Sequence, residues 1–82
     1  MREQLFVMEI EQAAGVVVAL RRCTVAEAFD EILDASKRHR VPPVRIARAL
    51  VALAEHGDLH DHHAVAAARY EWGALMELAV TQ

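Results

Sequence analysis

Apolar residues recur every three or four positions along most of the chain, the periodicity of helices that bury one face. In the first segment, over roughly residues 3–21, a 4-3-4-3 spacing joins Phe6, Ile10, Ala13, Val17 and Leu20. This spacing is typical of a helix that pairs with another helix. Gly15 lies inside the segment, where we expect it to permit close approach of a neighbouring backbone.

A second helix is predicted to begin just after Thr24. Thr24 and Glu27 have the residue types and spacing of a capping box, in which each side chain bonds the backbone amide of the other. The helix should end before Val41, because Pro42 disfavours helical backbone in the residue that precedes it. Pro43 suits the first position of a third helix.

The third helix is predicted to end at Gly57, which we expect in the left-handed conformation. Asp61 is a favourable N-cap for a fourth helix over about residues 61–80, whose apolar repeat includes Trp72 and Leu75. The pattern therefore predicts an all-α fold in a single domain over residues 1–82, a length at which chains do not divide into several cores.

Composition narrows the class of protein further. A hydrophobic fraction of 55% with three Gly and two Pro excludes disordered and fibrous chains. Cys23 is the only cysteine, which is typical of a reducing compartment, and no apolar run is long enough to cross a bilayer. These features predict a soluble, cytoplasmic protein that does not act at a membrane.

A chain of 82 residues buries a small core, so a partner that adds buried surface is expected. The apolar repeat of the first helix is the candidate surface for a homodimer. The candidate interface residues are Phe6, Ile10, Ala13 and Val17. The alternative is that this repeat, like that of the fourth helix, packs inside one four-helix core.

Charge is unevenly distributed although the net charge is only −3. Residues 24–34 carry acids and no base, whereas residues 35–54 carry bases and no acid. Clustered cations can neutralise nucleic-acid phosphates, and a solvated polar face is the simpler interpretation. With two arginines at the end of the first helix, the candidate RNA-binding residues are Arg21, Arg22, Lys37, Arg38, Arg40, Arg45 and Arg48.

Four short motifs in order resemble the ANTAR domain family. They are Ile10-Glu11-Gln12-Ala13-Ala14-Gly15, Cys23-Thr24-Val25-Ala26-Glu27-Ala28-Phe29, Ala35-Ser36 and Val44-Arg45-Ile46-Ala47-Arg48-Ala49-Leu50-Val51. The similarity covers an ANTAR-like core of about residues 8–52. It implies a three-helix bundle, here followed by a fourth helix, that binds RNA hairpins in transcription antitermination and commonly dimerises through its first helix.

The chain departs from the family pattern at basic positions that the resemblance associates with RNA contact. Ala14 stands where the family has Lys, and Leu33 followed by Asp34 stands where it usually has Arg and a further base. These changes remove part of the attraction for phosphate and support an alternative, a helical protein-interaction or dimerisation module without RNA binding. Binding of duplex DNA by the basic third helix is a third hypothesis.

Other chemistry finds little support in the sequence. Residues 56–63 contain four His and two Asp, but their spacing matches no closed structural zinc site, so we interpret them as a polar loop. Two arginines beside Cys23 can lower the pKa of a thiol, which leaves a redox role as a minor alternative. We predict no metal, no cofactor and no catalytic residues, and therefore no enzyme.

Overall fold

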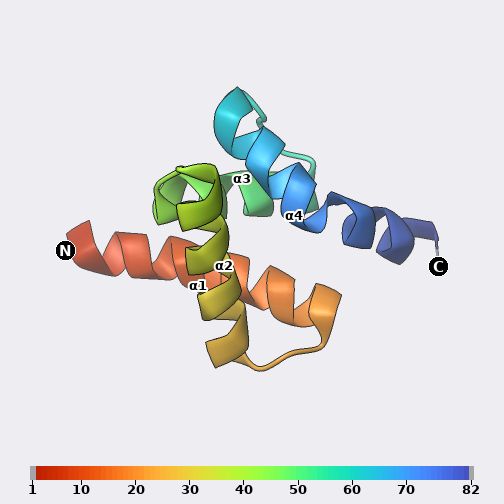
Figure 1. The fold of residues 1–82 in the computed structure, drawn as a ribbon, viewed down its shortest axis with the longest axis horizontal. Coiled ribbons are helices and arrows are strands. Elements are labelled where there is room, and N and C mark those ends of the chain that lie inside the picture. Colours follow the sequence, from red (N-terminus) through yellow and green to blue (C-terminus); the bar gives the residue numbers. More distant parts are fainter. Residues whose placement is uncertain (1, 82) are drawn as a thin grey trace.

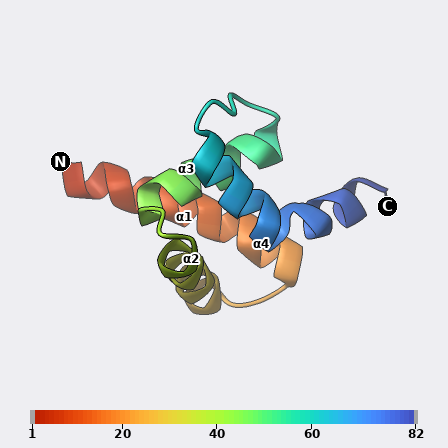
Figure 2. The same cartoon turned by 45° about the horizontal axis from the view of Figure 1, so that its top comes forward.

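The computed structural model describes the backbone of residues 2–81 and the side chains of residues 8–79. The helices are α1 (Arg2–Arg21), α2 (Val25–His39), α3 (Pro43–Glu55) and α4 (His62–Thr81), and the described chain contains no strand. The predicted all-α fold with a fourth helix is confirmed. The N-terminal turns of α1 and the C-terminal turns of α4 extend from the bundle at opposite ends (Figures 1 and 2).

The core lies where the four helices meet, and alanine dominates it. Its largest fully buried side chains are Trp72, Ile32, Ile46, Leu50, Val17 and Val41. Alanine side chains let neighbouring helices approach closely, so the few large residues fill most of the remaining space. Trp72 is the largest of them, and it packs α4 into the core together with the buried Ala64, Val65, Ala67 and Ala68.

The start of α2 shows the predicted capping box. The Thr24 hydroxyl accepts a hydrogen bond from the Glu27 amide at 3.1 Å, and the Thr24 amide donates to Glu27 Oε1 at 2.9 Å. The two hydrogen bonds from Thr24 lower the pKa of the Glu27 carboxyl. This cap is local in sequence, which is why residue types and spacing alone could predict it.

The end of α3 corrects the prediction for Gly57. His56, not Gly57, has the left-handed backbone, with φ of 57°, and no glycine in the described chain has a positive φ. The Gly57 amide donates to the Ala52 carbonyl at 2.8 Å, which is the six-residue bond of a Schellman motif. Histidine enters this region more readily than most side chains, so the helix ends one residue early.

Of two further local predictions, the one for Pro43 is confirmed and the one for Gly15 is wrong. Pro43 is the first residue of α3, as predicted. The expectation for Gly15 is wrong, because a Cβ built there meets nothing within 4 Å and the residue is exposed. Periodicity showed that Gly15 lies on a helix, but not that the neighbouring helices pack against its other face.

Candidate nucleic-acid interface

Most of the candidate cations lie on or beside the α2–α3 connection, whose shape is set by Ser36 and Val41. The Val41 amide donates to the Ser36 carbonyl at 3.1 Å, and the Ser36 hydroxyl donates to the Val41 carbonyl at 2.5 Å. Arg40 ends α2 with φ of 56°, so the chain turns sharply before Pro43 begins α3. The turn separates Lys37 and Arg38 from the arginines of α3.

Arg38 and His39, in the last turn of α2, share one acceptor on α4. Arg38 Nη1 donates to Glu71 Oε2 at 2.6 Å, and His39 Nε2 lies 2.7 Å from the same oxygen. The Glu71 side chain is 9% exposed. Burial raises the pKa of the Glu71 carboxyl, but the hydrogen bonds from Arg38 and His39 outweigh it, so the net shift is downward. Glu71 is therefore held as an anion beside the basic end of α2.

Arg45 and Arg48, one helical turn apart on α3, line one cleft with the loop that precedes α4. Arg45 makes a two-pronged ion pair with Asp61, from Nε to Oδ2 at 2.8 Å and from Nη2 to Oδ1 at 2.7 Å. The hydrogen bond from Arg45 lowers the pKa of the Asp61 carboxyl to about 2, assisted by the Ala64 amide. Asp61 thus acts as the predicted N-cap of α4 and as the partner of Arg45.

Two other arginines pair at the surface with carboxylates on neighbouring helices. Arg48 Nε donates to Glu9 Oε2 at 2.9 Å, which joins α3 to α1. Arg21 Nε lies 2.9 Å from Glu31 Oε1, which joins α1 to α2. Glu31 also accepts a hydrogen bond from the indole nitrogen of Trp72 at 2.6 Å. These arginines therefore link helices as well as presenting charge.

The structure divides the seven candidate RNA-binding residues into paired and unpaired groups. Four of them pair with carboxylates on another part of the fold: Arg21, Arg38, Arg45 and Arg48. Arg22, Lys37 and Arg40 form no ion pair with any residue whose side chain the structure describes. Sequence reasoning missed the anions, of which only Asp61 had a visible local signal, its position as an N-cap.

The candidate dimer residues are mostly internal to the chain. Ala13 and Val17 are fully buried in the core, and Ile10 is half-buried against it. The side chain of Phe6 lies outside the residues that the structure describes. Within this chain, the middle of the α1 repeat therefore packs against the other helices.

The three positions that depart from the family pattern differ in their surroundings. Ala14 is 1% exposed and belongs to the core, so a lysine there would have no open surface to reach directly. Leu33 is 39% exposed on α2, and Asp34 is exposed beside it. Position 14 is therefore part of the core, whereas positions 33 and 34 lie on the surface.

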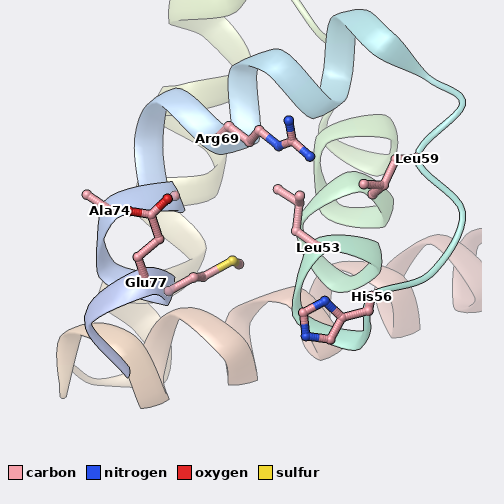
Figure 3. A pocket seen from close by; sticks show the side chains of 8 residues that line it. Leu53, His56, Leu59, Arg69, Ala74 and Glu77 are labelled. Carbon is pink, nitrogen blue, oxygen red and sulfur yellow. The ribbon is translucent and has the colours of Figure 1, made fainter. Parts of the chain in front are cut away.

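A groove between the end of α3 and α4 has a volume of about 590 Å³. Figure 3 shows Leu53 and Leu59 on one side of it, with Arg69 reaching across from α4. The groove is lined mainly by apolar side chains, with His56, Arg69 and Glu77 at its edges. It offers space for an apolar group but no arrangement of nucleophile and base.

The described residues form neither a metal site nor a helix that could cross a membrane. In the part of the chain that the structure describes, no three His, Cys, Asp or Glu side chains come together as metal ligands. Asp58 pairs with His60 at 3.0 Å in the exposed loop, and Cys23 is a half-buried free thiol. Among the described helices, none combines the length and the apolar character that a bilayer crossing needs.

The described chain is a small, alanine-rich helical bundle with cations on both sides of the α2–α3 turn. Comparison with protein-family models matches residues 8–51 to the ANTAR domain. The match spans more than half of the chain, and the protein belongs to the ANTAR domain family, whose members are RNA-binding regulators of transcription antitermination. No curated protein and no solved structure matches the chain. Helix α4 lies beyond the matched residues.

Proposed function

We propose that this protein regulates transcription antitermination by binding RNA hairpins in the cytoplasm. The observation that carries the proposal is the ANTAR match over residues 8–51, which includes α2, the α2–α3 connection and most of α3. Lys37 and Arg40 at that connection are exposed and form no ion pair with described residues. Hairpin loops are the expected target, because their bases are unpaired and accessible.

Phosphate contact would come from both sides of the α2–α3 turn. Arg48 is well exposed although it pairs with Glu9, and exposed ion pairs contribute at most about 1 kcal/mol. RNA phosphates can therefore compete for such an arginine. Guanidinium groups suit this role because their planar donors bind phosphate in pairs.

Replacing Arg45 and Arg48 together by Ala is expected to weaken binding to a two-hairpin RNA. Each phosphate contact releases condensed counterions, so the slope of log affinity against log salt should flatten by roughly one to two units. Fluorescence anisotropy over a salt series measures both effects. The matched control is Arg69→Ala, which removes a cation from α4 outside the matched residues and should leave the slope unchanged. An unaltered slope in the double variant would contradict the proposal.

A second candidate function is a protein-interaction module that uses the ANTAR scaffold without RNA. It is favoured by the outer surface of α2, where Val25 and Leu33 are exposed apolar side chains and Asp30 and Asp34 are exposed acids. Carboxylates repel phosphate, and exposed apolar side chains suit a protein partner. RNA affinity that is negligible at low salt would favour this function over the first.

We also propose that the protein is a homodimer that pairs through the N-terminal turns of α1. These turns extend from the bundle (Figure 1), and Met8 at their base is an exposed apolar side chain. Sedimentation at tens of micromolar should then give twice the monomer mass of 9.1 kDa. Met8→Glu should shift the population to monomer, whereas Val25→Glu on α2 should not. A native protein that sediments as a monomer would overturn this proposal.

A further inference from the structure

The carboxylates that hold Arg38 and Arg45 both come from the C-terminal segment outside the ANTAR match. Asp61 ends the loop before α4, and Glu71 lies in the middle of α4. The other two paired arginines, Arg21 and Arg48, use carboxylates within the matched residues. The segment that follows the family core thus supplies anions to the basic α2–α3 region on each side of its turn.

We propose that the loop and α4, residues 56–81, form an autoinhibitory element in which Asp61 occupies Arg45 and Glu71 occupies Arg38 in place of RNA phosphate. The inference rests on the proposed RNA-binding function and names how that surface is regulated. Residues 56–81 compete with RNA for Arg38 and Arg45 and so lower the affinity of the protein for RNA.

The geometry at Arg45 supports competition with phosphate. Asp61 takes Nε and Nη2 of the guanidinium at 2.8 and 2.7 Å, the paired arrangement in which arginine also binds phosphate. While Asp61 is bound, these donors are unavailable and the local charge is neutralised. The pair is only partly buried, and partly exposed pairs are weak enough for a polyanion to displace.

The geometry at Arg38 makes Glu71 the stronger of the two competitors. Glu71 is mostly buried and binds Arg38 and His39 through one oxygen, at 2.6 and 2.7 Å. The next residue along α4 is Trp72, whose side chain is fully buried, so the helix holds Glu71 in place. Asp61 and Glu71 are ten residues apart, which is about 15 Å along a helix. The segment therefore masks two separate points of the basic region.

The test compares Asp61→Asn/Glu71→Gln with a control of equal charge, Glu11→Gln/Glu77→Gln. Asparagine is as good an N-cap as aspartate, so the start of α4 is preserved while the charge at residue 61 is lost. Glu11 and Glu77 are exposed and form no ion pair with described residues. Thermal melting followed by circular dichroism checks that both proteins fold. The readouts are affinity for a two-hairpin RNA and the salt concentration that elutes each protein from immobilised heparin.

We expect the Asp61→Asn/Glu71→Gln protein to bind RNA about tenfold more tightly than the control, with a steeper salt slope, because two carboxylates no longer compete with phosphate for Arg45 and Arg38. It should also elute from heparin at higher salt. Adding Arg38→Ala and Arg45→Ala to this variant should abolish both gains. That loss would show that the gains arise from the two arginines.

Failure of the inference and failure of the proposed function have different signatures. If native protein binds RNA and the two charge-neutralised proteins behave alike with RNA and with heparin, the autoinhibitory role is overturned and the RNA function stands. If no protein binds RNA but only Asp61→Asn/Glu71→Gln is retained longer on heparin, the RNA function is overturned. Masking of Arg38 and Arg45 from polyanions is then supported.

Discussion

Replacing Trp72 by Ala is expected to lower the free energy of unfolding by about 3–5 kcal/mol, the usual cost of removing a large buried aromatic side chain. Trp72 is the largest fully buried side chain among the described residues, and it lies on α4. A domain of this size has a total stability of only about 4–12 kcal/mol, so the variant should lose a large part of its stability. Urea denaturation followed by circular dichroism measures the change.

Two companion variants separate packing from hydrogen bonding at Trp72. Trp72→Phe keeps most of the ring but loses the donor to Glu31, and it should cost about 1–3 kcal/mol, less than the alanine change. Tyr70→Ala removes an aromatic side chain that is 79% exposed and forms a T-shaped ring contact with His39, and it should change stability by no more than about 1 kcal/mol. Equal effects of Trp72→Ala and Tyr70→Ala would mean that α4 is not anchored by Trp72.

Restoring the family's cations at Ala14 and Leu33 is expected to affect stability differently: the change at Ala14 should destabilise the fold, and the change at Leu33 should not. Ala14→Lys places a long charged side chain in a closed core position and should lower the free energy of unfolding by about 2 kcal/mol or more. Leu33→Arg places a cation on the surface and should leave stability within about 0.5 kcal/mol. The same variant should strengthen binding to a two-hairpin RNA and steepen the salt slope by about one unit.

Ala19→Lys is the control for the change at Ala14. It adds the same side chain to the same helix at an exposed alanine, so it should alter stability by no more than about 0.5 kcal/mol. If Ala14→Lys were equally harmless, position 14 would be open to solvent in solution. If Leu33→Arg left RNA binding unchanged in a folded protein, the outer surface of α2 would not contact RNA.

The parts of the fold that the sequence predicted are those set by neighbouring residues. The capping box at Thr24 and the start of α3 at Pro43 depend on contacts within a few positions. The exact residue at which α3 ends was harder to predict, because His56 and Gly57 can both adopt the left-handed conformation. In the structure His56 adopts it and Gly57 does not.

The environment of the candidate site depended on residues far apart in the chain. Arg38 and Glu71 are 33 residues apart, and Arg48 and Glu9 are 39 apart, so neither pair has a local signal. Ala14 presented a similar difficulty. Alanine fits a helix surface and a helix interface equally well, and only the assembled bundle decides which surrounds it.

Arg22 and Arg40, at the ends of α1 and α2, contribute positive charge at some cost in conformational stability. Both have a left-handed backbone, with φ of 54° and 56°, where a side chain costs about 1 kcal/mol and glycine costs almost nothing. Both are also exposed cations without an ion pair among the described residues. Glycine at either position would give a more stable bundle that carries less positive charge. The chain thus tolerates conformational strain at two helix ends where its arginines remain available to a polyanion.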